Sequence, residues 1–278
     1  MYITFENNIG SIRITGGGGV WQLIEVDGLG GATYDVQTAY IKGREGRVTS
    51  SLQSLERSIS LKGDITAKDS MHLVTQAGRV LDSEGRLKIE HGTKKRMINA
   101  RCTAFIPEME RGGIRPFVMQ FVCDDPFFTD FNPQVIDVAT VEKLLYGTLD
   151  LTDGVMFSTG RTKAVINNMG VKKAEPVVEV SCNNDMTGDV ITITNPTTNQ
   201  LLNINYSLKA GDKLKVDIPK RTVELNGEQR FDILSTNSFL SDFYLAPDKN
   251  QVEITTNHPN DRLTASIIYN NRYNEAIV

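Results

Sequence analysis

The sequence predicts a mainly β protein of two domains, in which the first domain also carries one helix and a β-hairpin. Apolar and polar residues alternate over many short segments bounded by Gly, Asp and Asn, as expected for half-buried strands. Helical spacing of apolar residues occurs over one stretch, residues 67–85. From about Val135 onward, Asn, Thr and Asp become frequent and strand-like segments recur between turns, which favours a β-sandwich or jelly roll.

The beginning of the chain is predicted to form strands. In "GSIRIT" the residues Ile12 and Ile14 share one face, and in "RSISLKGDI" the residues Ile59 and Leu61 do the same. The segments "VWQLIEVDG" and "YDVQTAYIKGREGR" lie between them and have the same alternation. These patterns indicate a β-rich first domain.

The predicted helix lies within "AKDSMHLVTQAGRVLDSEG". Its N-terminus can be capped by Asp69 or Ser70. Its expected apolar stripe consists of Met71, Val74, Ala77 or Gly78, and Leu81. The segments "RLKIEHG" and "MINARCTAFIPEM" that follow are predicted to form a β-hairpin, and the basic cluster Lys94–Arg96 is interpreted as its solvated face.

The stretch "PFVMQFVCDDPFFTD" contains adjacent carboxylates, Asp124 and Asp125, beside Cys123. This arrangement is compatible with a metal site, an acid/base pair or the end of a buried strand. Consecutive strand residues point to opposite faces, whereas catalytic carboxylates must converge on one substrate. Pro126 also ends strand pairing. We therefore interpret the carboxylates as a strand end, and we predict domains over residues 1–133 and 134–278.

Two segments of the second half resemble ligand-binding loops without matching them. In "GVMFSTGRT" the glycines Gly154 and Gly160 are one residue too far apart for a phosphate loop, and Arg161 stands where lysine is required. The segment "NNDMTGDVITIT" has oxygen-bearing side chains at calcium-loop spacing, but Thr194 occupies the position of the essential glutamate. A β-turn accounts for the oxygen-bearing residues Asn183, Asp185 and Thr187, with Gly188.

The aromatic cluster "FLSDFYL" bears on sugar binding, because glycan sites use exposed aromatic platforms. Its aromatic residues are Phe239, Phe243 and Tyr244. We expect Phe239 and Leu245 to lie in the core. The one tryptophan, Trp21, is in the other half of the chain.

Composition and the remaining reactive residues point away from an enzyme. Residues 1–136 hold 16 basic and 16 acidic residues, so all of the net charge of −4 falls in the remainder, and no basic face for nucleic acid is expected.

The histidines and cysteines lack metal-ligand spacing, and the cysteines are predicted to be free thiols; these residues are His72, His91, His258, Cys102, Cys123 and Cys182. No signal peptide or membrane span is expected. We predict no catalytic residue, no cofactor and no metal; a hydrolase assembled from distant carboxylates is the competing hypothesis.

Five segments in the same order resemble the distal tail protein (Dit) family of siphophages, over almost the whole chain. Three lie in the first domain: the R-x-I-x-L-x-G-x-I segment Arg57–Ile65, the G-x-L turn Gly85–Leu87, and the apolar strand ending in Asp-Pro-aromatic, Phe121–Phe128. Two lie downstream: "NNMGVKKAEPVVEV" and "LKAGDKLKVDIPKRTVELNGE". The segment "DSEG" departs from the Pro- and Gly-rich turn of the family.

The resemblance implies a structural protein of the tail tip of a siphophage or prophage, made in the bacterial cytoplasm. The first domain would form the wall of a homo-hexameric ring, single or stacked, and the second, a galectin-like or jelly-roll domain, would project outward. Its partners would be the major tail tube protein, a tail-associated lysin or hub protein, and in some relatives a receptor-binding protein. The alternative is a stand-alone carbohydrate-binding β-sandwich adhesin.

Overall fold

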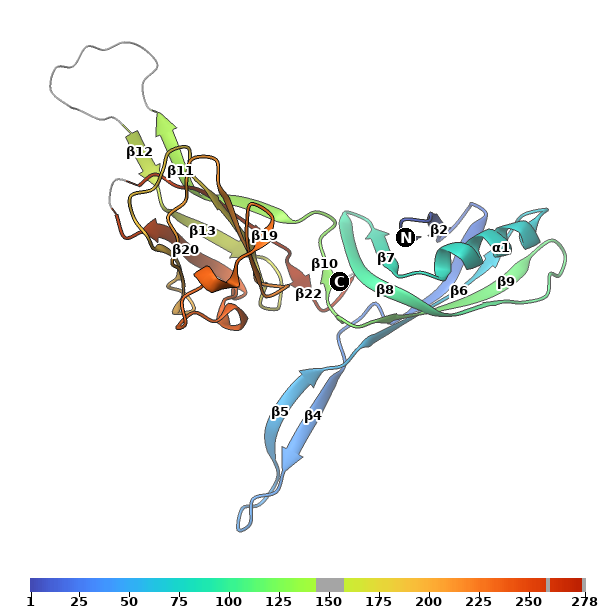
Figure 1. Ribbon diagram of the computed structural model, residues 1–278. Helices are drawn as coiled ribbons and strands as arrows, with labels where there is room; N and C mark the ends of the chain where they lie inside the picture. The colour runs from blue at the N-terminus through green and yellow to red at the C-terminus, as the bar shows by residue number, and fades with distance from the viewer. Residues whose placement is uncertain (144–157, 259–260, 277–278) are drawn as a thin grey trace. The chain divides into compact units, whose positions relative to one another are not determined.

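The computed structural model describes residues 1–143, 158–258 and 261–276, and it confirms the predicted mainly β fold class. The chain forms two compact units (Figure 1). Unit 1 consists of Met1–Phe131 together with Tyr273–Val278, and unit 2 of Asn132–Arg272. Residues 273–276 thus pack in unit 1, whereas the predicted second domain, 134–278, included them. None of the helices in the described residues is both long and apolar enough to cross a membrane.

Unit 1 is a barrel-like sheet of nine strands in the order β22-β10-β8-β7-β1-β2-β3-β6-β9. It closes because the long strand β8 pairs with β7 through residues 94–100 and with β9 through residues 101–107. The strands are β1 (Tyr2–Glu6), β2 (Ser11–Thr15), β3 (Trp21–Asp27), β6 (Arg57–Ile65), β7 (Gly85–His91), β8 (Lys94–Pro107), β9 (Arg115–Cys123), β10 (Phe128–Thr129) and β22 (Arg272–Tyr273).

The alternation of the sequence explains the core of unit 1. Along β6 every second residue is buried, including Ile59 and Leu61, as predicted. The aromatic rings of Phe5 and Phe121 lie 5.2 Å apart, and Trp21 meets Phe117 edge-on at 5.1 Å. Each such fully buried side chain contributes about 1.5–3 kcal/mol to the stability of the barrel.

The single α-helix, α1 (Ser70–Leu81), is capped by Asp69, whose side chain accepts a hydrogen bond from the backbone N–H of His72 at 3.2 Å. Ala77 and Leu81 are buried as expected, but the prediction for Met71 was wrong, because this residue is 63% exposed. The inward face begins at Ser70 and not at Met71. Ser70 occupies its start, where its hydroxyl hydrogen-bonds the carboxylate of Glu110.

The predicted hairpin is present as β7–β8, but its basic cluster is only partly solvated. Lys94 and Lys95 are exposed. Arg96 is half-buried, forms an ion pair with Asp130 at 2.6 Å, and stacks on the ring of Tyr273 at 3.6 Å. The pairing of β10 with β8 brings Asp130 beside Arg96, which corrects the interpretation of this residue as part of a solvated face.

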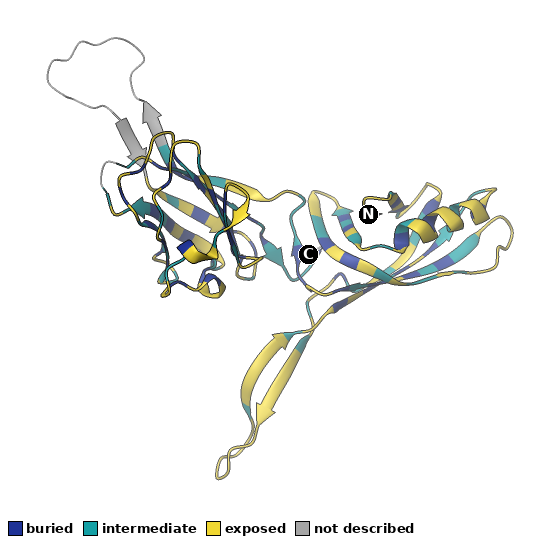
Figure 2. Ribbon diagram, viewed as in Figure 1, coloured by how far each residue is buried: buried dark blue, intermediate teal, exposed yellow. Residues whose placement is uncertain are grey.

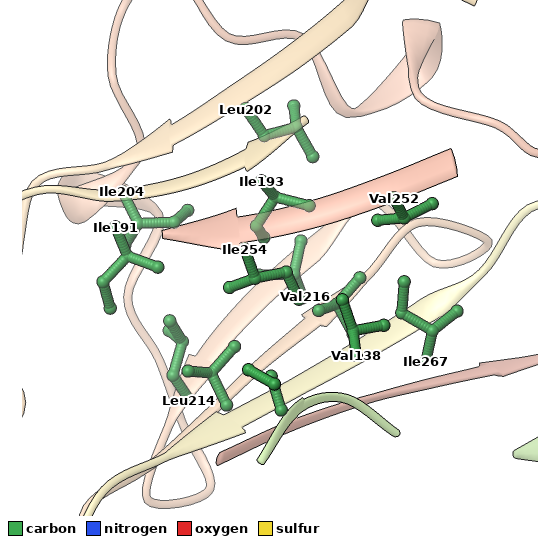
Figure 3. Close-up of a cluster of buried hydrophobic side chains, with 14 of the residues drawn as sticks. Val138, Ile191, Ile193, Leu202, Ile204, Leu214, Val216, Val252, Ile254 and Ile267 are labelled. Carbon is green, nitrogen blue, oxygen red and sulfur yellow. The ribbon is translucent and has the colours of Figure 1, made fainter. Parts of the chain in front are cut away.

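Unit 2 is a β-sandwich whose core lies between a seven-stranded and a four-stranded sheet (Figure 3). The larger sheet has the order β12 (Ser158–Arg161), β11 (Gln134–Lys143), β21 (Thr264–Tyr269), β14 (Val177–Ser181), β17 (Lys213–Asp217), β18 (Thr222–Leu225), β19 (Glu228–Gln229). The smaller has the order β13 (Lys163–Asn168), β20 (Asp248–Thr256), β15 (Ile191–Asn195), β16 (Gln200–Ile204). Two 3₁₀ turns, Phe231–Ile233 and Leu240–Asp242, connect β19 to β20.

The segment that contains the aromatic cluster is fixed by buried asparagines. The side-chain N–H groups of Asn195 and Asn168 donate to the carbonyls of Tyr244 and Leu245, at 2.9 and 3.1 Å. Asn250 accepts from the backbone N–H of Ala246 at 2.8 Å. The backbone of a long connection is thereby satisfied inside the sandwich.

Phe243 and Leu245 are buried, but the expectation of a core position for Phe239 was wrong, because its side chain is 61% exposed. Phe239 immediately precedes the 3₁₀ turn Leu240–Asp242, so the alternation that holds along a strand does not reach it.

Candidate assembly surface

The most exposed element of unit 1 is a second hairpin, here called the arm, formed by β4 (Tyr34–Ala39) and β5 (Val48–Ser54). It is a separate two-stranded sheet that projects from the barrel, and almost all of it is exposed (Figures 1 and 2). Sequence analysis predicted strand-like alternation over residues 34–47, but it gave no sign that this segment leaves the rest of the first domain.

The arm has one apolar face. Val36 and Leu52 are cross-strand partners and are 50% and 62% exposed, and the opposite face carries Asp35, Gln37 and Gln53. At the tip, Tyr40 and Ile41 are 73% and 51% exposed. An isolated two-stranded hairpin is only marginally stable in water, and its unpaired edges and apolar side chains favour pairing with another chain. The arm therefore has the properties of a docking element.

The root of the arm lies close against the barrel. Gly28 has a φ of +89°, and a Cβ there would lie 2.1 Å from the carbonyl oxygen of Ser58, so only glycine fits. The next residue, Leu29, is 4% exposed. On the other strand, the N–H of Leu55 donates to the carbonyl of Thr33 at 2.9 Å.

Arg57, the first residue of the segment Arg57–Ile65, is the centre of this root. It is 6% exposed, and its guanidinium donates to four backbone carbonyls, those of Gly28, Gly30, Pro126 and Asn274, at 2.6–2.7 Å. It also stacks on the ring of Phe128 at 4.6 Å. Burial lowers the pKa of Arg57. The Arg57 segment and the Asp-Pro-aromatic strand end therefore meet in space.

The carboxylates Asp124 and Asp125 lie at the strand end that was predicted. Asp125 accepts a hydrogen bond from the N–H of Phe127 at 3.3 Å, which stabilises the turn through Pro126. The side chain of Asp124 is 85% exposed and lies 3.9 Å from Arg101. Beside them, burial raises the pKa of the Cys123 thiol to about 12, so this thiol stays protonated at neutral pH. The geometry is that of a turn.

The other reactive residues are dispersed. Burial raises the pKa of Cys102 and of Cys182 as well, and all three cysteines are free. His72 meets Gln76 on the exposed side of α1, and His91 is exposed at the hairpin turn. Within residues 1–143, 158–258 and 261–276, no group of three or more His, Cys, Asp or Glu side chains is placed to hold a metal. The phosphate-loop-like segment, residues 154–162, lies partly outside the described residues, and its described part forms β12 (Ser158–Arg161).

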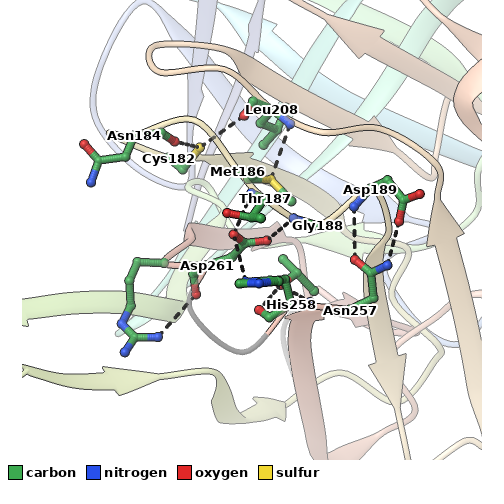
Figure 4. Close-up of polar contacts among 12 residues, drawn as sticks. Cys182, Asn184, Met186, Thr187, Gly188, Asp189, Leu208, Asn257, His258 and Asp261 are labelled. Carbon is green, nitrogen blue, oxygen red and sulfur yellow. Dashed lines mark hydrogen bonds and ion pairs between the residues drawn. The ribbon is translucent and has the colours of Figure 1, made fainter.

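The calcium-loop-like segment of unit 2 is a turn held by a distant carboxylate (Figure 4). The side chain of Asp261 is 2% exposed and accepts from the backbone N–H groups of Thr187 and Gly188 at 2.8 and 2.9 Å. Asn257 bonds both backbone and side chain of Asp189. Burial acts to raise the pKa of Asp261, but the hydrogen bonds from Thr187, Gly188 and the Thr256 side chain and the neighbouring His258 together outweigh it, so the pKa is lowered.

Replacing Asp261 with asparagine is expected to destabilise unit 2 by about 1–3 kcal/mol at pH 7, because one buried N–H loses its charged acceptor. Because the pKa of Asp261 is lowered in the folded state, its carboxylate stabilises the fold at pH values above the unfolded-state pKa of 3.8. This stabilisation is lost as the pH falls through the folded-state pKa. Urea unfolding of both proteins should therefore show a larger difference at pH 7 than at pH 3, which lies below the unfolded value of 3.8. An equal difference at both pH values would contradict the assignment.

Comparison with known proteins begins with unit 2. Residues 169–273 match the family model described as siphovirus-type tail component, C-terminal domain. The match confirms the resemblance to a siphophage tail component over this part of the chain.

Solved structures are similar in fold to this chain over both units. The Dit protein of phage SPP1, described as a paradigm of the hub adsorption apparatus in phages infecting Gram-positive bacteria, has a TM-score of 0.68 at 15% identity, covering 90% of this chain and 92% of that one. A chain of the phage P2 baseplate in its activated conformation with Ca has a TM-score of 0.52 at 8% identity, and the match covers 100% of this chain and 99% of that one. A chain of the same baseplate with Sr has a TM-score of 0.51 at 9% identity, and the match covers 96% of this chain and 97% of that one. No curated protein matches the sequence.

Proposed function

We propose that this protein forms a hexameric ring at the tip of a siphophage tail, in which the arm of each copy docks on the next copy. The exposed apolar face of the arm supports this most directly, because it is left uncovered by its own chain. A contact between two different surfaces of identical copies is heterologous, and such contacts close into rings when the rotation permits. Unit 1 would build the ring wall, and unit 2 would carry attachment points.

In this proposal the ring joins the major tail tube protein to a tail-associated lysin or hub protein, with receptor-binding proteins as further partners. The protein is made in the bacterial cytoplasm, ends in the virion tail tip, and is not an enzyme. The equal numbers of acidic and basic residues in 1–136 suit a passage for DNA that does not bind it. The adhesin alternative is less well supported, because Phe243 and Trp21 are buried in the cores of their units.

The test is the double substitution Val36→Ser with Leu52→Ser, which makes the apolar face of the arm polar. Light scattering should give about 185 kDa for the wild type, as six chains of 30.8 kDa, and a monomer for the variant. Burial of each side chain contributes about 1.5–3 kcal/mol, repeated at every contact of a ring, so a large loss of assembly is expected.

The matched control is Gln37→Ser with Gln53→Ser on the opposite face of the arm, which should assemble normally. Circular dichroism should show both variants folded, since these side chains lie outside the barrel core. A wild-type protein that stays monomeric at high concentration, shows no ring in negative-stain micrographs and binds no tail partner would overturn the proposal.

A further inference from the structure

The chain returns to unit 1 after completing unit 2, and its returning segment, Tyr273–Ala276, is tied down at both ends. At the first end, the ring of Tyr273 lies 3.6 Å from the guanidinium carbon of Arg96, and its hydroxyl lies 3.3 Å from the carboxylate of Asp130. Arg96 and Asp130 themselves form the half-buried ion pair at 2.6 Å. This end is therefore attached to β8 and to the residue that follows β10.

The second end of the returning segment lies against the root of the arm. The carbonyl of Asn274 accepts from Arg57 at 2.7 Å. The N–H of Ala276, which is 2% exposed, donates to the carbonyl of Leu29 at 3.0 Å. With the two bonds from Arg57 to Gly28 and Gly30, three successive carbonyls at the arm root are held by Arg57 or by the returning segment.

The direction of the arm must be set at this root. Almost all side chains of β4 and β5 are exposed, so the arm has no packing of its own to hold it against the barrel. The glycines that flank Leu29, namely Gly28, Gly30 and Gly31, add no side-chain packing. What restrains the backbone here is the set of hydrogen bonds from Arg57 and Ala276, together with the burial of Leu29 and the hydrogen bond from the Tyr34 hydroxyl to the side-chain oxygen of Asn274 at 3.5 Å.

We propose that Arg57 and the returning segment form a latch that fixes the direction of the arm, so that assembly of one copy on the next depends on residues 273–276. This inference rests on the proposed ring and assigns a positioning role to residues that follow the whole of unit 2. The latch acts within one copy and prepares the arm before any partner arrives.

The test cuts the latch at two separate points. Arg57→Lys keeps the positive charge. A lysine ammonium has only three N–H groups on one nitrogen, so it cannot donate to all four carbonyls that the guanidinium of Arg57 contacts. Tyr273→Ala removes the stacking on Arg96 at the far end and takes nothing from the Arg57 cluster. Glu275→Ala is the matched control in the same segment, because the described contacts include no hydrogen bond or ion pair of its side chain.

Hydrogen exchange followed by mass spectrometry should be measured in the Val36→Ser, Leu52→Ser background, so that ring contacts do not mask the root. Exchange at residues 29–34 should be faster by roughly tenfold or more in both latch variants, as for the loss of one or two hydrogen bonds, and unchanged in the control. Strands β6 and β9 should keep their protection. Light scattering in the otherwise wild-type background should show loss of rings in the latch variants alone.

Unchanged exchange at the root in Tyr273→Ala would overturn the latch, and so would rings that form normally despite a loosened root. Should Arg57→Lys also expose β6 and β9, Tyr273→Ala decides the question. A wild-type protein without rings would instead overturn the proposed function, while the exchange measurement would still decide whether the latch exists.

Discussion

Replacing Gly63 with alanine is expected to unfold the barrel of unit 1 or leave it destabilised by about 3 kcal/mol or more, at the upper end of the range for overpacking. Gly63 lies in the middle of β6, between β3 and β9. A Cβ at this position would lie 2.0 Å from the carbonyl oxygen of Gln22 and 2.8 Å from the ring of Phe117. The backbone oxygen cannot move away without breaking the pairing of β3 with β6.

The matched control is Gly78→Ala in α1, where a Cβ meets nothing within 4 Å. This substitution should stabilise the helix by about 0.5–1 kcal/mol, because alanine has the higher helix propensity. Thermal unfolding of both variants, followed by near-ultraviolet dichroism, measures the contrast. A Gly63→Ala protein as stable as the wild type would contradict the close approach of the β3 backbone to residue 63 of β6.

Replacing Phe243 with alanine is expected to destabilise unit 2 by about 3–5 kcal/mol, as for a large aromatic side chain removed from a packed core. Phe243 is 1% exposed and belongs to the sandwich core with Leu245 and Leu240. The loss should appear as a lower urea midpoint for unit 2, with unit 1 unchanged, since the substitution lies outside its core.

Phe239→Ala is the control, because this side chain is 61% exposed, and its removal should change the stability of unit 2 by less than about 0.5 kcal/mol. The pair also bears on the adhesin alternative. Glycan binding that is abolished by Phe243→Ala in a fully stable protein would favour that alternative and contradict the burial of this residue. Equal effects of the two substitutions on stability would contradict the packing of the connection around Phe243.

Much of each unit follows from local signals. Alternation placed Ile59 and Leu61 in the core because the period of a strand is fixed at two residues. Asp69 was one of two candidates for the helix cap, since its side chain can reach the free N–H groups of the first turn. Only the first residue of the predicted helical stripe was wrong, because Met71 is more apolar than Ser70, yet Ser70 is the residue that has polar partners inside.

What the sequence by itself determined is the mainly β class, the two-part organisation of motifs, the helix, the β7–β8 hairpin and the turn at Asp125, all of which depend on residues a few positions apart. Only the tertiary structure decided that Tyr34–Ser54 leaves the barrel as an arm, and that Arg57 joins Gly28, Pro126 and Asn274. Arg57 and Asn274 are 217 positions apart, and no local pattern encodes which distant carbonyls a buried guanidinium will find. Their meeting depends on the closure of the barrel and on the return of the chain after unit 2, because a buried cation must have its N–H groups satisfied wherever the fold provides acceptors.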